Sequence, residues 1–187
     1  MSQPYVPGGS KIYVSTPGSQ AMLFLGYCES EIRPQFTVAH EPIFADYGGP
    51  AVPVDSQMMG EYAVVPMDLI RYNENVLMAL MRRSAVTGSA AGTGGSGSIG
   101  SLMLHENAAV RLVLISPYAA TKSAYSSMVP CLNFGFAYAM GDVIMPMGIR
   151  VRRPRLVMGC YPVVDPATSG YTLYTTSVAG LTLPNPD

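Results

Sequence analysis

Two short segments hold residue types that could carry out redox chemistry on a bound cofactor. The glycine-rich run Val86-Thr87-Gly88-Ser89-Ala90-Ala91-Gly92-Thr93-Gly94 has the spacing that lets backbone amides approach a dinucleotide phosphate. Tyr118 precedes Lys122 by four positions, and a lysine beside a tyrosine favours the ionised phenol, which can then take part in proton transfer. These segments are the strongest candidates for catalysis in the sequence.

The two segments resemble the TGxxxGxG loop and the YxxxK pair of short-chain dehydrogenases, but their setting does not fit that family. A dinucleotide-binding glycine loop follows a buried strand and opens a helix of a βαβ unit. Here the run follows a predicted helix and leads to none, and Tyr118 comes only 31 residues after Thr87. The string Gly95-Ser96-Gly97-Ser98-Ile99-Gly100 fails for the same reason. A dehydrogenase is therefore a remote alternative, and we expect no catalytic residues and no cofactor.

The side chains that bind metals or act as nucleophiles are scattered along the chain. They are Cys28, Cys131, Cys160, His40 and His105. A zinc site needs Cys or His at short spacing, and the acidic residues do not follow the spacing of a calcium loop. We therefore expect buried thiols in a reducing compartment, structural histidines and no metal site.

The composition indicates a protein whose surface is covered by copies of itself. Only 12% of residues are charged and 49% are hydrophobic, whereas soluble domains carry about 25% charged residues. The most apolar stretch, residues 128–149, is interrupted by prolines, glycines and Asp142, so we expect no membrane span and no signal peptide. We then expect self-association to bury the weakly charged surface. This expectation favours a structural subunit of a repeating assembly.

Charge is divided unevenly along the chain. Residues 1–80 carry eight acidic and three basic side chains, a net charge of −5, and residues 81–187 carry four acidic and eight basic ones, a net charge of +4. One explanation is chance; the other is opposite poles that favour head-to-tail contact between identical subunits. On the second explanation the interface residues are Arg150, Arg152, Arg153 and Arg155, which would meet Glu29, Glu31, Glu41 and Asp46 of a neighbour. A phosphate contact is an alternative for the basic cluster, although the net charge of −1 gives no general attraction for nucleic acid.

Turn residues and side-chain alternation predict a mostly β (α+β) fold. The 19 glycines and 16 prolines imply many turns, and the Tyr, Val and Thr content favours strands. We expect strands at 11–15, 21–29, 57–66, 102–105, 110–116, 128–139, 142–153, 155–164 and 170–178, an extended region at 32–45 and a loop at 46–55. The one good helix lies between Tyr72 and Arg83, with Asn73 as its cap. Its apolar side chains share one face: Val76, Leu77, Leu80 and Met81.

We expect a single domain over residues 1–187 with three irregular segments. They are an extended N-terminal arm at 1–10, a Gly/Ser-rich loop at 87–101 and an irregular tail at 181–187. The loop holds too few apolar residues to fold on its own. The order of strands, one helix and more strands predicts a β-sandwich or barrel with one flanking helix and long loops.

The segment 32–83 resembles a known family. It contains Pro42-Ile43-Phe44-Ala45-Asp46-Tyr47-Gly48-Gly49-Pro50-Ala51-Val52-Pro53-Val54-Asp55, then Met59-Gly60-Glu61-Tyr62-Ala63, and then the helical Asn75-Val76-Leu77-Met78-Ala79-Leu80. An extended strand, a loop with Asp-x-Gly and Pro-x-Asp, a glycine-led strand and a helix follow one another. This layout resembles structural proteins of tailed bacteriophages, in particular tail tube proteins.

The resemblance implies a virion protein that assembles in the host bacterial cytoplasm. It implies a β-sandwich or barrel with a flanking helix, in hexameric rings that stack into a tail tube. Viral DNA would pass through the lumen without sequence-specific binding, and the homo-oligomer would contact other virion proteins. Neighbouring barrels in such rings continue their sheets across subunits. The Gly/Ser loop and the Pro-rich ends depart from the family pattern, so a capsid decoration or head–tail connector protein is the alternative.

Overall fold

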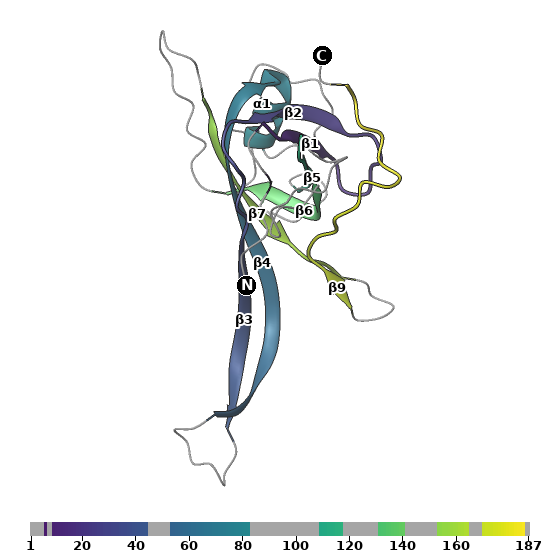
Figure 1. Ribbon diagram of the computed structural model, residues 1–187. Coiled ribbons are helices and arrows are strands. Elements are labelled where there is room, and N and C mark those ends of the chain that lie inside the picture. The colour runs from purple at the N-terminus through teal and green to yellow at the C-terminus, as the bar shows by residue number, and fades with distance from the viewer. Residues whose placement is uncertain are drawn as a thin grey trace.

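The computed structural model describes residues 6, 9–44, 53–82, 109–117, 131–140, 153–164 and 170–185. Within these residues the main unit is an antiparallel sheet of seven strands (Figure 1). In the order in which neighbours pair, the strands are β2 (Leu23–Cys28), β1 (Lys11–Ser15), β5 (Val110–Ile115), β6 (Cys131–Ala139), β7 (Arg155–Tyr161), β4 (Pro53–Tyr72) and β3 (Gln35–Phe44). The prediction of a mostly β fold with one short helix is confirmed.

Six of these strands close into a barrel because β2 pairs with β4 as well as with β1. The closing ladder joins Gly26 to Tyr72, Tyr27 to Arg71 and Cys28 to Leu69. β4 therefore has β7 on one edge, while its other edge carries β3 along its first half and β2 at its end. Closure removes the open strand edges that would otherwise invite pairing with other chains.

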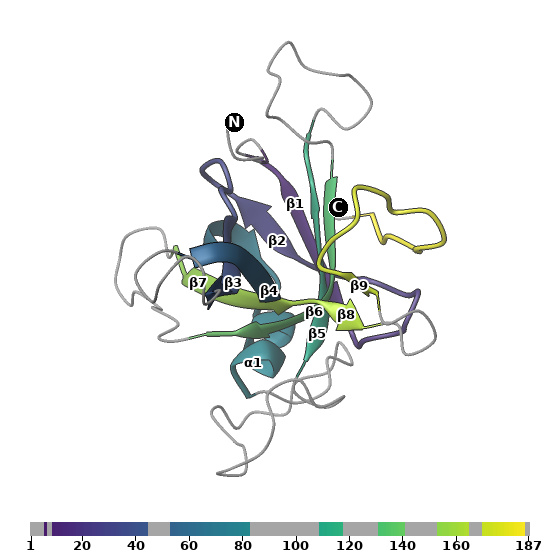
Figure 2. The same cartoon turned by 90° about the horizontal axis from the view of Figure 1, so that it is seen from below.

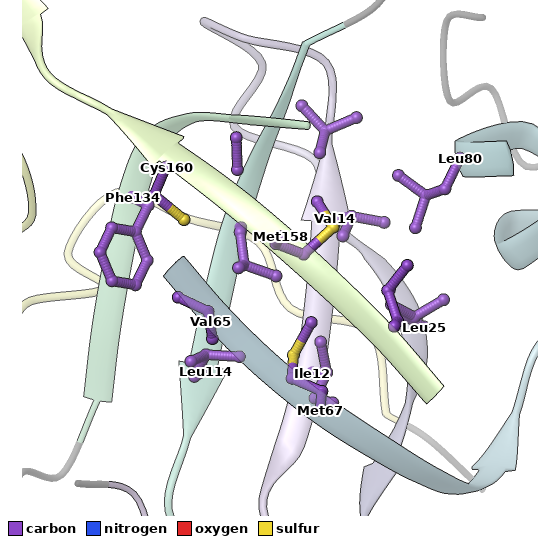
Figure 3. Close-up of a cluster of buried hydrophobic side chains, with 14 of the residues drawn as sticks. Ile12, Val14, Leu25, Val65, Met67, Leu80, Leu114, Phe134, Met158 and Cys160 are labelled. Atoms are coloured by element: carbon purple, nitrogen blue, oxygen red, sulfur yellow. The ribbon is translucent and has the colours of Figure 1, made fainter. Parts of the chain in front are cut away.

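Alternate apolar side chains fill the barrel. Along β4 the residues Ala63, Val65, Met67 and Leu69 are buried while their neighbours are not, which is the period of two expected for a strand with one face on the core. Side chains from β1, β2, β4, β5, β6 and β7 meet inside, together with Leu80 of the helix (Figure 3). The core is therefore shared by strands that lie far apart in the sequence.

The helix α1 (Glu74–Arg82) follows β4 directly and packs beside β2. The Oδ1 atom of Asn73 accepts hydrogen bonds from the backbone N–H groups of Asn75 (3.1 Å) and Val76 (3.3 Å). These bonds satisfy two donors that the first turn leaves without a helical partner. Leu77 and Leu80 are buried in the core, so the predicted cap and apolar face are both confirmed.

Several predicted boundaries are wrong. β4 runs from Pro53 to Tyr72, far beyond the predicted strand 57–66, because β3 pairs along its first half and the barrel strands along its second half. The predicted strand 155–164 breaks after Tyr161, and β8 (Val163–Val164) pairs with β9 (Tyr171–Thr172) in a separate small sheet. The predicted strand 170–178 shrinks to β9. The predicted strand 102–105, the loop 87–101 and nearly all of 142–153 lie outside the described residues.

Residues 173–185 form a C-terminal strap that runs from the main core at Leu173, past β6, where Thr175 bridges Asn133, to the outer face of β1, β2 and β5. Three apolar strap residues pack there against a second, smaller core, and the contacts join Val178, Leu181 and Leu183 to Tyr13, Met22 and Val113. The predicted irregular tail is irregular over 181–185, with a single bridge to Ala21. Of the predicted N-terminal arm, Val6 is buried and bridges Ile32. No helix in the described part of the chain is long and apolar enough to cross a membrane.

Candidate assembly surface

β3 and the first half of β4 leave the barrel and form a two-stranded arm, residues 35–44 and 53–62 (Figure 1). Figure 2 looks at the molecule from below, nearly along this arm. The 10 residues of β3 give the arm a length of about 33 Å at 3.3 Å per residue. A two-stranded hairpin is marginally stable on its own in water. Packing against another surface would therefore stabilise the arm.

One face of the arm carries exposed apolar side chains. At the root, Phe36 lies opposite Ala63 and still packs on the core. Beyond this point Val38, Phe44 and Met58 are 49%, 50% and 47% exposed. Alternation along β3 and its pairing with β4 place on this inner arm face the residues Val38, His40, Pro42, Phe44, Met58, Ser56 and Glu61. The face that fills the barrel interior thus continues outside the barrel, where its apolar side chains stay about half exposed and Tyr171 of the small sheet reaches Met58.

A β-bulge shapes the arm. The register passes from Ala39 opposite Gly60 to His40 opposite Met58, so that Met59 is the extra residue. Gly60 has φ +150°, a backbone conformation that a residue with a Cβ rarely adopts. The bulge places Met58, and not Met59, opposite His40 on the inner arm face.

Stacked tyrosines tie the root of the arm to the barrel. The ring centroids of Tyr62 on β4 and Tyr161 on β7 are 6.1 Å apart, and those of Tyr161 and Tyr138 on β6 are 5.6 Å apart, with nearly parallel planes. The hydroxyls of Tyr138 and Tyr161 are 3.3 Å apart. The small sheet adds a contact further out, where the Tyr171 hydroxyl donates to the Met58 sulfur at 3.2 Å. These contacts fix the direction in which the arm leaves the barrel.

Two of the predicted interface acids already have partners in their own chain. Arg153 pairs with Glu29 at 2.8 Å, and Glu31 pairs with Arg33. The Arg153 pair arises because backbone hydrogen bonds hold Glu29 to Asp68 and Leu69 to Pro154, so that the end of β2 and the start of β7 flank the same part of β4 and the two side chains meet across it. Arg153 and Glu29 thus pair within one chain, and their contact with a neighbouring subunit stays a prediction.

The remaining predicted interface residues divide into two groups. Arg155 and Glu41 are exposed, Arg155 at the start of β7 and Glu41 on the arm. Arg150, Arg152 and Asp46 lie outside the described residues. For both groups, contacts with a neighbouring subunit stay predictions.

The end of the barrel that lies furthest from the arm along β4 carries basic side chains, of which Arg71 and Arg155 are exposed and Lys11 is half-buried. Lys11, Tyr27 and Arg71 form one row across β1, β2 and β4. A second bulge at Ile70 turns both Ile70, which is 38% exposed, and Arg71 to the outer side. Arg155 lies nearby, opposite Asp68. We call Lys11, Tyr27, Ile70, Arg71 and Arg155 the distal patch.

The residues with possible chemistry give no reactive centre among those described. Cys28, Cys131 and Cys160 are all free and buried, as predicted, and burial raises the pKa of each thiol. His40 is exposed on the arm. Over the described ranges no group of three or more His, Cys, Asp or Glu residues could hold a metal ion. His105 and the dehydrogenase-like segments 86–94 and 118–122 lie outside those ranges.

Sequence reasoning missed the inner arm face. It assigned 46–55 to a loop, because Gly48-Gly49-Pro50 and Pro53 are typical of turns, and it assigned 57–66 to an ordinary strand. One signal could have found the arm: residues 35–62 contain four acids and no Lys or Arg, while apolar side chains recur among them.

No family model matches this sequence, and no curated protein is similar to it.

Proposed function

We propose that this protein is a structural subunit of a phage tail, which self-assembles into stacked hexameric rings that form the tail tube for DNA passage. The observation that carries the proposal is the inner arm face, whose apolar side chains Val38, Phe44 and Met58 stay about half exposed. Soluble monomers rarely expose contiguous apolar patches unless these bind something. An arm of this kind, on a chain with 12% charged residues, favours a function in assembly.

The pairing of the strands also supports self-association. β3 stands last in the sheet order and pairs only with β4 among the described strands, so its outer edge presents backbone N–H and C=O groups over 10 residues. Such an edge is a template for a strand of another chain. A ring in which neighbouring barrels continue one sheet would occupy it.

The tail tube in particular is favoured by where the family resemblance falls. The segment 32–83 that resembles tail tube proteins forms β3, β4 and α1, which are the arm, the longest strand of the barrel and the helix. The elements of the resemblance are thus the same ones that carry the candidate assembly surface. A capsid decoration or connector protein is the alternative, since it too would use an arm to reach a neighbour.

Negative-stain microscopy and sedimentation velocity of the purified protein test the proposal. We expect rings or tubes for the wild type, and a folded monomer for the triple variant Val38→Ser, Phe44→Ser, Met58→Ser. A matched control removes the exposed apolar side chains that lie off this face, Ile43→Ser with Met59→Ser, and should still assemble. A wild type that stays monomeric at every concentration and salt would refute the proposal, and single unstacked rings or compact trimers would favour the alternative.

A further inference from the structure

We propose that the arm of one copy docks on the distal patch of a second copy, with the inner arm face against Ile70 and Tyr27. The contact is head-to-tail, because the two surfaces lie on different parts of the molecule. This inference rests on the proposed function, since it names the surfaces through which assembled subunits would touch.

Charge is the first reason for this pairing of surfaces. The acidic side chain placed on the inner arm face is Glu61, whereas the distal patch holds Lys11, Arg71 and Arg155. Among the described residues the ion pairs are Glu31 with Arg33 and Glu29 with Arg153, so Glu61 and Arg71 have no ion-pair partner there. Complementary potentials of this kind select one partner surface and orientation over others.

The distribution of apolar side chains is the second reason. The inner arm face has Val38, Met58 and Phe44 spaced along its length, and the distal patch has the exposed Ile70 beside Tyr27. Both surfaces therefore combine apolar side chains with charged ones, as protein interfaces do. Glu61 lies opposite Val38 on the inner arm face. In the proposed contact it lies beside Arg71 of the second copy.

Length is the third reason. β4 has 20 residues, of which 53–62 belong to the arm and 63–72 to the barrel. Each half spans about 33 Å, so the arm can overlap a neighbouring barrel along the full course of its strand. Since the arm and the patch are separate surfaces, each copy can give one contact and receive another. A contact of this type continues into a ring or a stack, unless two copies exchange their arms reciprocally and close a two-fold dimer.

Cross-linking between two populations, each with one added cysteine, tests the contact. One population carries Glu61→Cys with an affinity tag and the other carries Arg71→Cys without it, and a short bis-maleimide is added to the mixture. The native thiols are buried and give little background. We expect at least about fivefold more tagged–untagged dimer than for the control mixture of Glu41→Cys with Arg71→Cys, because Glu41 points to the opposite face of the arm. Equal yields in the two mixtures, or a dominant dimer of two tagged Glu61→Cys chains, would overturn the proposal.

Charge reversal gives a second measurement in the assembling protein. Glu61→Lys and Arg71→Glu should each raise the critical concentration for assembly about fivefold, and the double variant should return it to within about twofold of wild type. Glu41→Lys makes the same change of charge on the opposite arm face and should leave it unchanged. If the critical concentration of the double variant rises by the product of the two single-variant factors, the proposal is overturned.

The two measurements separate this inference from the proposed function. A specific cross-link between positions 61 and 71 without rings or tubes would leave the contact standing and refute the tail tube. Rings or tubes without that cross-link would leave the function standing and overturn the contact.

Discussion

Replacing Gly26 by alanine should weaken the seam that closes the barrel. A Cβ at Gly26 would lie 2.5 Å from the backbone oxygen of Arg71 and 3.1 Å from the Cα atom of Tyr72. Both atoms belong to the backbone of β4, which cannot rotate away as a side chain can. The new methyl group therefore pushes β2 and β4 apart at the place where the ring of strands closes.

The cost follows from the seam's small size. Overpacking by one methyl group costs about 1–3 kcal/mol where the neighbours cannot adapt. Only three residue pairs form the β2–β4 ladder, flanked by backbone bonds from Asn73 to Leu25 (2.7 Å) and from Glu29 to Asp68 (2.9 Å). Losing one such bond adds about 1 kcal/mol. We expect the free energy of unfolding to fall by about 3 kcal/mol in total, and Tm by about 6–12 °C.

Gly159→Ala is the matched control. Its Cβ would also clash, but with the sulfur of Met140 and, at 2.8 Å, with Cγ of the same side chain. A methionine side chain is flexible and can move aside, so this substitution should cost less than about 1 kcal/mol. Urea unfolding followed by far-UV circular dichroism measures both variants. A cost for Gly159→Ala equal to or above that for Gly26→Ala would refute the reasoning that backbone contacts at the seam decide the loss.

Three further substitutions test the core, the thiols and the helix cap. Phe134→Ala should lower the free energy of unfolding by about 3–5 kcal/mol because the ring is fully buried, whereas Phe44→Ala, on the exposed arm, should leave it almost unchanged while weakening assembly. Burial raises the pKa of the Cys160 thiol, so above about pH 8.5 the unfolded state loses a proton that the folded state keeps. Unfolding free energies measured by urea titration should therefore fall as pH rises from about 8.5 to 10, by up to about 1.4 kcal/mol per pH unit for each such thiol, and less steeply in Cys160→Ala. Asn73→Ala removes two hydrogen bonds to the first turn of α1 and should cost about 1 kcal/mol in the same titration.

The parts of the fold that depend on local signals could be predicted from the sequence. Asn73 before an amphipathic run predicted α1, and the short apolar segments at 11–15 and 110–116 predicted β1 and β5 to within one residue. These elements are specified by their own side chains, through capping and through alternation. The buried thiols followed in the same way from the apolar stretches around them.

The closure of the barrel and the arm could not be predicted in this way, because both depend on pairing between distant segments. Nothing near Gly26 indicates that it meets Tyr72, and the need for a residue without a Cβ appears only once the two strands are side by side. Pro53 and Gly60 indicate strand ends in isolation. β3 overrides that tendency, since it supplies hydrogen-bonding partners along the whole first half of β4 and the bulge accommodates Gly60.

The charge pattern shows how a sequence-level idea changes once the chain is folded. Opposite charges in the two halves of the sequence predicted contact between subunits, but one predicted pair, Glu29 with Arg153, forms within the chain because β2 and β7 both lie against the end of β4. An exposed pair of this kind adds little stability, about 0–1 kcal/mol, and each of its two charges already has a partner of opposite sign. The charges left for such a contact are those without an ion-pair partner in the described part of the chain, of which Glu61 and Arg71 stand on the same strand at opposite sides of the barrel. A head-to-tail assembly needs two different contact surfaces on each subunit. β4 runs through both the arm and the barrel, so it holds the two surfaces at a fixed separation.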